Sequence, residues 1–300
     1  MIAVHIESGA ILIRRNDIPR RPVGHALLRT RVVGICNTDI ELQRGYYGFT
    51  GIPGHEFVAD VVAADTPALL GKRVVGEINL ACGRCEFCDQ KLGRHCANRT
   101  VLGIVKHPGA FAEYLTLPET NLHIVPDSIL DEEAVFVEPL AAACEILDQV
   151  AIGRGEHVAV LGPGKLGSLI ACVLTARGAK VTTFGRHTAK PRSAYKFVVD
   201  ATGSTTGLKE AITMVQPRGT VIMKSTIHGD IALDTAPIIV NEITLIGSRC
   251  GRFEPAIQLL KDREVDVRPL ISARFPLRHA EAAFSQAAKP GVLKVLLSPE

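Results

Sequence analysis

The first 125 residues consist of short apolar runs that glycine, proline and polar residues interrupt. Apolar and polar positions alternate within these runs, and turn residues bound them, which is typical of β-strands. The pattern therefore predicts a β-rich region with long loops. The apolar runs that mark its expected strands are residues 26–33, 57–63, 73–78 and 112–117, and the first of these strands extends to residue 35.

From about residue 140 onward, strand-like and helix-like stretches alternate along the chain. Alternating strands and helices indicate a parallel β-sheet with helices on both faces, so the fold class is α/β. The expected strands are residues 157–161, 180–184, 197–201, 220–224 and 243–247, and the expected helices are residues 166–177 and 208–215. A tail after residue 251 adds helices at 255–261 and 279–288 and a final strand at 292–297.

Composition and charge restrict the class of protein. The chain has 300 residues, of which 47% are hydrophobic and 22% charged, as in globular proteins. Single cores stop growing at ~250–300 residues, which favours two domains. The net charge is +3, and the interleaved acidic and basic residues disfavour a nucleic acid or an anionic membrane as partner. Neither a signal peptide nor an apolar run of ~18 residues is present, so we expect a cytoplasmic protein.

Four of the eight cysteines lie close together, at Cys82, Cys85, Cys88 and Cys96. A disulfide cluster is disfavoured because cytoplasmic thiols stay reduced. An iron–sulfur run of the bacterial ferredoxin type would place the fourth cysteine after three residues with a proline behind it. Here seven residues intervene and Ala97 follows. A redox pair needs only two cysteines, so the spacing predicts a structural zinc held by four thiolates.

A glycine-rich turn follows the predicted strand at 157–161 and opens the predicted helix. In that context the pattern GxGxxG indicates a dinucleotide site. Its first glycine permits the tight turn, its second lets a pyrophosphate approach the backbone, and its third lets the helix pack against the strand. Amide groups at the helix N-terminus would donate to the anion. The turn consists of Gly162, Pro163, Gly164, Lys165, Leu166 and Gly167.

The end of the strand at 180–184 indicates which dinucleotide binds. An NAD site normally carries Asp or Glu about 20 residues beyond the glycines, where it accepts from the ribose 2′-OH. Gly185 and Arg186 occupy that place here, and Lys190 follows. Glycine leaves room and the arginine fork matches a 2′-phosphate, so NADP is favoured over NAD. Alternatively, Arg186 stacks on the adenine and is indifferent to the phosphate.

Three segments that lie far apart in the sequence offer further metal-ligand types. Cys36 follows one predicted strand, His55 and Glu56 precede another, and Glu138 lies where the two patterns meet. Each of them also has an ordinary structural interpretation. Together they supply one thiolate, one imidazole and two carboxylates, enough for a catalytic zinc with an open fourth position.

Six segments therefore stand in one order along the chain: Gly34-Ile35-Cys36-Asn37-Thr38-Asp39, Gly54-His55-Glu56, the four-cysteine lobe, Val137-Glu138-Pro139-Leu140, the glycine-rich turn and Asp200-Ala201-Thr202-Gly203. This set resembles the zinc-dependent medium-chain dehydrogenase/reductase superfamily of alcohol and sorbitol dehydrogenases, over nearly the whole chain. It is closest to the branch that carries Glu at the position of Glu138, as polyol and sugar dehydrogenases do. The resemblance implies a GroES-like catalytic domain at 1–140 with a zinc lobe at 82–96, a Rossmann domain at 141–251, and a return to the catalytic domain at 252–300.

The resemblance also implies roles for individual residues. Cys36 and His55 would bind the catalytic zinc, and Glu56 or Glu138 would complete the site. Asp39 would orient a zinc ligand from behind. The hydroxyl of Thr38 would take the proton of the bound alcohol. The implied cofactor-binding residues are the six of the glycine-rich turn together with Gly185, Arg186, Lys190 and Thr202.

The expected function is a zinc-dependent oxidoreductase with two zinc ions per chain, one catalytic and one structural. It would transfer hydride between NADP(H), or with less support NAD(H), and an alcohol, polyol or sugar or its carbonyl. Tyr46, Tyr47 and Phe49 would line the substrate pocket or simply pack within their loop, and Arg249 lies where polyol-oxidising relatives place an arginine. The resemblance implies a homodimer or homotetramer, often joined through the strand at 243–247.

Two features depart from the family pattern. Glu41 occupies the place where many relatives carry a histidine at the outer end of the proton relay. Only ten residues, 187–196, follow Arg186 before the next predicted strand, whereas a strand–helix–strand unit needs roughly thirty. Either an edge strand has been lost or a segment is missing from this chain. An alternative function therefore remains, namely a zinc-stabilised scaffold or nucleotide sensor that no longer transfers hydride productively.

Overall fold

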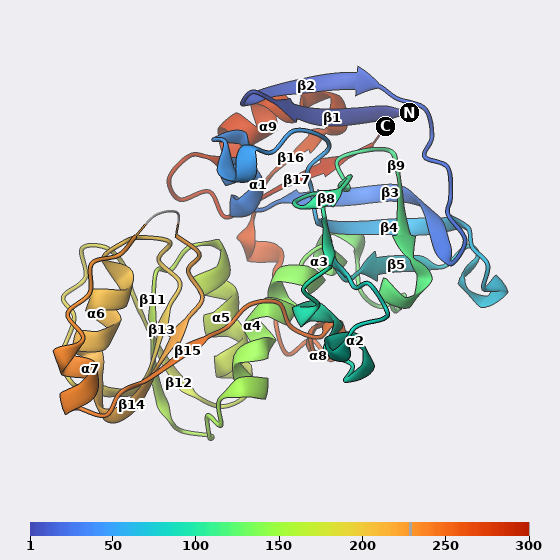
Figure 1. The fold of residues 1–300 in the computed structure, drawn as a ribbon. Helices are drawn as coiled ribbons and strands as arrows, with labels where there is room; N and C mark the ends of the chain where they lie inside the picture. Colours follow the sequence, from blue (N-terminus) through green and yellow to red (C-terminus); the bar gives the residue numbers. More distant parts are fainter. Residues whose placement is uncertain (228–229, 300) are drawn as a thin grey trace. The chain divides into compact units, whose positions relative to one another are not determined.

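The computed structural model describes residues 1–227 and 230–299. The chain divides into two compact units, of which the first comprises Met1–Glu138 with Ile257–Glu300 and the second Pro139–Ala256 (Figure 1). Each unit has its own β-sheet and its own core. The first unit carries the zinc-ligand candidates at its start and in its cysteine lobe, and the second carries the glycine-rich turn.

The first unit is built on a seven-stranded sheet in the order β10-β5-β4-β3-β17-β16, with β9 also paired to β3. The long strand β3 alternates buried and exposed residues before its last four, all of which are buried. The C-terminal strand β17 pairs antiparallel with β3, so both ends of the chain share one sheet. The strands are β3 (His25–Ile35), β4 (Glu56–Ala63), β5 (Arg73–Gly76), β9 (Tyr114–Pro118), β10 (Leu122–Ile124), β16 (Ile271–Pro276) and β17 (Lys294–Ser298).

Smaller elements surround this sheet. A hairpin of β1 and β2 precedes it in the sequence, and a three-stranded sheet of β6, β7 and β8 flanks the cysteine lobe along the chain. Their bounds are β1 (Ile2–Glu7), β2 (Ala10–Arg15), β6 (Asn79–Leu80), β7 (Thr100–Leu102) and β8 (Lys106–His107). The helices are α1 (Asn37–Gln43), α2 (Glu86–Asp89), α3 (Asp131–Ala134) and α9 (Ala280–Ala287), with α8 (Phe253–Lys261) at the boundary of the two units.

The second unit confirms the predicted parallel sheet. Its five strands run in the order β12-β11-β13-β14-β15, and every neighbouring pair is parallel. Helices lie on both sides of it, as expected for strands that alternate with helices (Figure 1). The strands are β11 (His157–Leu161), β12 (Lys180–Phe184), β13 (Tyr195–Asp200), β14 (Val215–Met223) and β15 (Thr244–Gly247). The helices are α4 (Val137–Gln149), which begins in the first unit, α5 (Lys165–Ala176), α6 (Gly207–Met214) and α7 (Ala236–Val240).

The short segment after Arg186 leaves β12 at the edge of this sheet. Residues 185–194 join β12 to β13 without a helix and pass the intervening strand β11. Strands lie about 4.8 Å apart and an extended residue spans up to ~3.4 Å, so ten residues suffice for this crossing without a helix. A further strand and helix at this edge are absent from the described part of the chain.

The boundaries of the predicted elements agree closely with the structure where the pattern is strong. Strands at 157–161 and 180–184 are confirmed residue for residue as β11 and β12, and the helix at 166–177 is α5 displaced by one residue. The strand at 73–78 ends earlier, at Gly76, and the strand at 220–224 starts earlier, at Val215.

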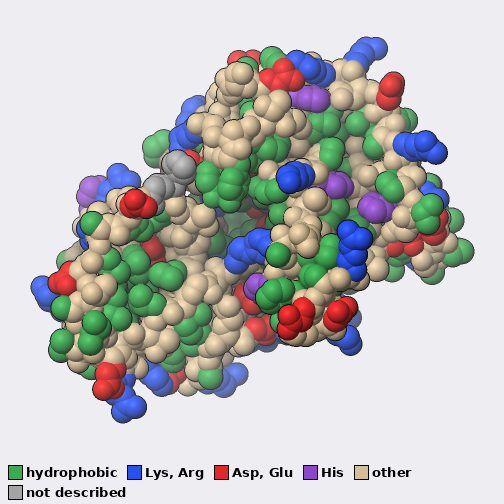
Figure 2. Space-filling view, viewed as in Figure 1, with side chains coloured by type: hydrophobic (Ala, Val, Ile, Leu, Met, Phe, Trp, Pro, Cys, Tyr) green, Lys and Arg blue, Asp and Glu red, His purple; other side chains and the backbone are tan. Residues whose placement is uncertain are grey.

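None of the helices within residues 1–227 and 230–299 has the length and hydropathy needed to cross a membrane. On the face shown in Figure 2, basic and acidic side chains are interspersed over the surface of both units. This distribution agrees with the small net charge of +3.

Candidate functional site

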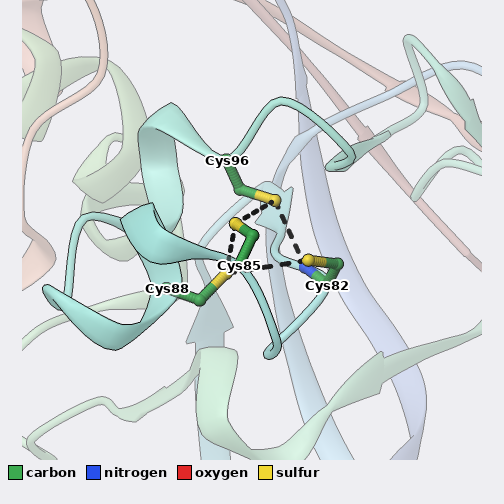
Figure 3. Close-up of side chains that lie close together, drawn as sticks. All are labelled: Cys82, Cys85, Cys88 and Cys96. Atoms are coloured by element: carbon green, nitrogen blue, oxygen red, sulfur yellow. Dashed lines mark hydrogen bonds between the residues drawn. The ribbon is translucent and has the colours of Figure 1, made fainter.

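The four cysteines of the lobe converge on one point (Figure 3). Their sulfur atoms are 3.9 Å apart for Cys82 and Cys88, 3.5 Å for Cys85 and Cys88, and 3.7 Å for Cys85 and Cys96. Four thiolates at ~2.3 Å from a tetrahedral zinc would have sulfurs about 3.8 Å apart. The donor set and its spacing therefore fit a structural zinc.

The lobe has almost no hydrophobic core that could hold it without a metal. Among residues 82–96, only Cys96 is buried. The amide N–H of Cys82 donates to the sulfur of Cys96 at 3.5 Å, and this bond is the largest of several hydrogen bonds that together lower the pKa of the Cys96 thiol to about 6. A thiol that ionises readily is a good zinc ligand, because the thiolate is the form that binds metal.

A second cluster lies at the ends of two central strands of the first unit. One ligand atom each from Cys36, His55 and Glu56 lies within 4.8 Å of the others. The register of the sheet explains why they meet: Gly34 of β3 pairs with Glu56 at the start of β4. Cys36 follows β3 directly and forms the N-cap of helix α1. A thiolate, an imidazole and a carboxylate at this spacing fit the three protein ligands of a catalytic zinc.

Asp39 is fully buried and contacts the segments that carry Cys36 and His55. Its carboxylate accepts from the amides of Cys36 at 2.8 Å and Gly54 at 3.2 Å. It also lies 3.4 Å from Nδ1 of His55. Burial lowers the pKa of His55, but the charges of Asp39 and Cys36 outweigh burial and raise the pKa well above its ordinary value. Although Nδ1 lies this close to the carboxylate, it is buried and forms no hydrogen bond with any described residue.

Glu56 is buried and is paired with a lysine from the opposite end of the chain. Its Oε2 accepts from Nζ of Lys294, a residue of β17 that is itself only 3% exposed. Burial lowers the pKa of Lys294, but the charge and hydrogen bond of Glu56, together with the charges of Cys36 and Glu138, outweigh burial, and the net shift is upward. Gly34 makes room for this pair, because a Cβ there would lie 2.7 Å from Oε2 of Glu56. The other oxygen, Oε1, is buried and has no hydrogen-bond partner among the described residues.

The remaining candidates of this region lie around the cluster. The thiol of Cys36 contacts the hydroxyl of Thr38 at 3.7 Å. Glu41 is partly exposed and forms an ion pair with Arg44 at 2.8 Å. Glu138 lies in the first turn of α4 and is not among the three clustered residues, although its charge acts on Lys294.

Lys294→Met is expected to destabilise the protein by about 3 kcal/mol, because it leaves Oε2 of Glu56 buried without its ammonium partner. A urea denaturation series followed by circular dichroism measures the loss. Lys289→Met is the matched control, since the Lys289 side chain is exposed and donates to the side chain of Gln286. The double variant Glu56→Gln, Lys294→Met should recover part of the stability. Equal stability of Lys294→Met and Lys289→Met would contradict the buried pair.

The glycine-rich turn has the geometry that its sequence predicts. Gly162 has a positive φ of 89°, and a Cβ there would lie 2.6 Å from the carbonyl oxygen of Ala201. A Cβ on Gly167 would overlap the carbonyl oxygen of Gly162, so only glycine lets α5 approach the strand this closely. Gly164, the N-cap of α5, has open space around it. That space at a helix N-terminus suits a pyrophosphate.

A cavity of about 370 Å³ lies beside this turn in the second unit. Of the predicted cofactor-binding residues, the structure brings Gly162, Gly185, Arg186, Lys190 and Thr202 to its wall. Pro163, Gly164, Lys165, Leu166 and Gly167 form the adjacent turn and the start of α5 and do not line this cavity.

Thr202 serves the local structure as well as the cavity wall. Its amide and its hydroxyl both donate to Oδ1 of the buried Asp200, at 3.0 and 2.8 Å. These bonds fix the loop at the carboxyl end of β13, which is the central strand of the sheet. In open α/β sheets, ligands bind at this end of the strands.

The candidate substrate residues lie on exposed segments. The rings of Tyr46 and Tyr47 have centroids 4.1 Å apart and are tilted by 36°, and the hydrogen bond with Tyr47 raises the pKa of Tyr46 to about 12. Phe49 follows them and is half-buried. Arg249 is exposed, and its carbonyl oxygen accepts from Nζ of Lys224 at 2.8 Å.

One functional residue that the sequence analysis did not identify is Lys294. The signal was present, because this lysine interrupts the otherwise apolar run of residues 292–297. A lysine within a buried strand requires a counter-charge. Its partner Glu56 is 238 positions away in the sequence, so only the sheet register could identify the pair.

Comparison with known proteins supports a family assignment. Residues 22–127 match the model of the alcohol dehydrogenase GroES-like domain. The chain is 30% identical to D-altritol 5-dehydrogenase of Agrobacterium fabrum, with 98% of each chain covered. It is 25% identical to sorbitol dehydrogenase of Halalkalibacterium halodurans, with 97% of this chain and 96% of the relative covered.

Solved structures agree with these matches. A protein from Sinorhizobium meliloti 1021 that is described as a zinc-binding dehydrogenase, bound to NADP, superposes with a TM-score of 0.90. It is 26% identical over 99% of both chains. Alcohol dehydrogenase from Thermus sp. ATN1 has a TM-score of 0.92 at 24% identity over the full length of both chains, which supports the same fold.

Proposed function

The chain belongs to the zinc-dependent medium-chain alcohol and polyol dehydrogenases, and from this premise we propose that it transfers hydride between NADP(H) and a polyol or the corresponding carbonyl. Membership makes it an NAD(P)-dependent oxidoreductase. The polyol substrate is proposed because two relatives that match over nearly the whole chain are named for altritol and sorbitol.

One observation carries the proposal for the reaction centre: within residues 1–227 and 230–299, no group forms a hydrogen bond with the buried Oε1 of Glu56, which lies beside Cys36 and His55. An unpaired carboxylate oxygen costs free energy when it is buried, unless a cation binds it. We therefore propose that Glu56 completes the zinc site through Oε1 while Lys294 retains Oε2. Glu138, which is half-buried nearby, is the alternative ligand.

A zinc ion held by these residues supplies a Lewis acid that lowers the pKa of an alcohol oxygen. Asp39 keeps His55 oriented, and Lys294 fixes the direction of Glu56. Thr38, whose hydroxyl lies against Cys36, is placed to receive the alcohol proton. Glu41 is partly exposed one helical turn away on α1, where it or water can pass the proton to solvent.

The second unit would hold the cofactor. The open space at Gly164 accommodates the pyrophosphate, and the wall of the 370 Å³ cavity accommodates the adenosine end. No carboxylate stands at the end of β12, where Gly185 and Arg186 take its place. We propose that Arg186 binds a 2′-phosphate and that NADP(H) is therefore preferred.

Arg186→Ala is expected to weaken NADPH binding about 20-fold and NADH binding less than twofold, since a hydrogen-bonded charge pair contributes ~1.5–3 kcal/mol. The measurement is a titration that follows the fluorescence of the reduced nicotinamide; the chain has no tryptophan, so little protein emission interferes. We expect the wild-type protein to bind NADPH more tightly than NADH.

Arg192→Ala is the matched control, because Arg192 is exposed in the same connection and does not line the cavity. Equal losses for both cofactors in Arg186→Ala would mean that Arg186 contacts the adenine instead. A wild-type protein that binds neither cofactor would contradict the proposed function and favour the scaffold or sensor.

Further proposals concern metal content and assembly. The geometry of Cys82, Cys85, Cys88 and Cys96 supports a structural zinc, giving two ions per chain with the catalytic one. We propose a cytoplasmic homodimer or homotetramer, joined through the edge strand β15 of the five-stranded sheet. Tyr46, Tyr47, Phe49 and Arg249 are proposed to shape the substrate site.

A further inference from the structure

The cavity of the second unit contains a carboxylate that the cofactor motif does not include. Glu210 lies in α6 and lines the same wall as Arg186 and Lys190. Its side chain is 37% exposed and that of Lys190 is 15% exposed. Oε2 of Glu210 forms an ion pair with Nζ of Lys190 at 3.3 Å.

The ammonium group of Lys190 has three partners. Besides Glu210, its Nζ donates to the carbonyl oxygens of Arg186 at 3.4 Å and Thr188 at 3.3 Å. Two of its three N–H donors thus have a backbone acceptor, and the carboxylate of Glu210 forms an ion pair with the same ammonium. A ligand phosphate would have to compete with these contacts for Lys190. The contact with Glu210 is the one between side chains, and it can be released without unfolding the turn.

The local fold explains why Glu210 faces this lysine. The connection of residues 185–194 is short and carries no helix, so Lys190 stays next to the cavity. Helix α6 begins close to the loop after β13: a Cβ on its first residue, Gly207, would overlap the carboxylate of Asp200. The first turn of α6 thereby brings Glu210 to the cavity.

We infer that Glu210 is a specificity-determining residue of the cofactor pocket, whose charge holds Lys190 and opposes a 2′-phosphate. This inference rests on the proposed function, since it assumes that the adenosine end of the cofactor occupies the cavity. A 2′-phosphate would have to draw Lys190 away from Glu210 and would then lie beside a like charge. The 2′-OH of NAD(H) is neutral and meets neither obstacle. Glu210 therefore moderates the preference for NADP(H) that Arg186 creates.

Glu210→Gln tests this directly, because it keeps the size of the side chain and removes its charge. We expect NADPH to bind about fivefold more tightly and NADH to change less than twofold in the fluorescence titration. The gain should shrink when the ionic strength is raised, because salt screens partly exposed charges. It should also shrink in a Lys190→Gln background, where there is no ammonium left to release.

Glu156→Gln is the matched control. Glu156 lies in the same unit and pairs with Lys196 at 2.9 Å, but it does not line the cavity. This variant should leave both affinities unchanged. The inference would be overturned if Glu210→Gln changed the NADPH and NADH affinities equally, weakened the binding of either cofactor, or changed neither affinity. In each of these cases, cofactor binding by the wild-type protein would still uphold the proposed function. Wild-type protein that binds neither cofactor would instead remove the proposed function and the inference with it.

Discussion

Cys36→Ser is expected to lower turnover by about 10³-fold and to reduce the zinc content from two ions per chain to one. A hydroxyl is a much poorer zinc ligand than a thiolate, and loss of a Lewis acid costs several kcal/mol of transition-state stabilisation, about 4 kcal/mol for 10³-fold. Steady-state oxidation of a polyol panel with NADP⁺ measures the first effect. Metal analysis after gel filtration measures the second, and it does not depend on having found the right substrate.

Cys172→Ser is the control for this experiment. Cys172 is a half-buried thiol in α5, outside both clusters of metal-ligand residues. It should retain two zinc ions and full turnover. Should Cys36→Ser retain both as well, the assignment of the catalytic zinc to Cys36, His55 and Glu56 would be wrong.

Cys88→Ser is expected to remove the structural zinc and to open the lobe at residues 82–96. Only Cys96 of that lobe is buried, so beyond local backbone hydrogen bonds the metal would supply most of the free energy that opposes the conformational entropy of the lobe. Arg84 and Lys91 are exposed there and are trypsin sites. We expect cleavage at these two residues to become roughly 100-fold faster, because proteolysis follows the population of the open form. Mass spectrometry of the first fragments measures this.

Glu86→Gln provides the matched control within the same lobe. Glu86 is exposed and accepts from the side chain of Gln90 at 3.0 Å, but it is no metal ligand. This variant should keep its zinc and resist trypsin like the wild-type protein. The structural-zinc proposal would be abandoned if Cys88→Ser kept two zinc ions and the same resistance.

The elements that the sequence predicts best are those whose pattern is local and strong. Strand β11 has four buried apolar residues in succession and then a glycine-rich turn, so its bounds follow from the chain itself. Strand β14 begins at Val215, five residues before its predicted start, because Val215 pairs with Tyr195; residues 216–219 are unpaired with β13, and Arg218 has a positive φ of 61°, so the turn that Pro217 and Gly219 indicate lies inside the strand as an irregularity. Helix α4 was not predicted; Pro139 lies in its first turn, where proline is tolerated.

The sequence by itself determined the family, the two groups of zinc-ligand candidates and the dinucleotide turn. Each of these depends on spacing between near neighbours or on residue types that have few other uses. Cysteines three residues apart, or glycines at fixed positions between a strand and a helix, constrain the local backbone directly.

Only the tertiary structure decided which charges meet. Gly34 of β3 pairs with Glu56 of β4 on one side and with Leu296 of β17 on the other, and this register brings Lys294 to Glu56. In the second unit, the short connection and the close start of α6 bring Lys190 to Glu210. Such pairs join elements that are remote in sequence. Strand register and helix packing place their side chains together, and no local sequence pattern encodes either of them.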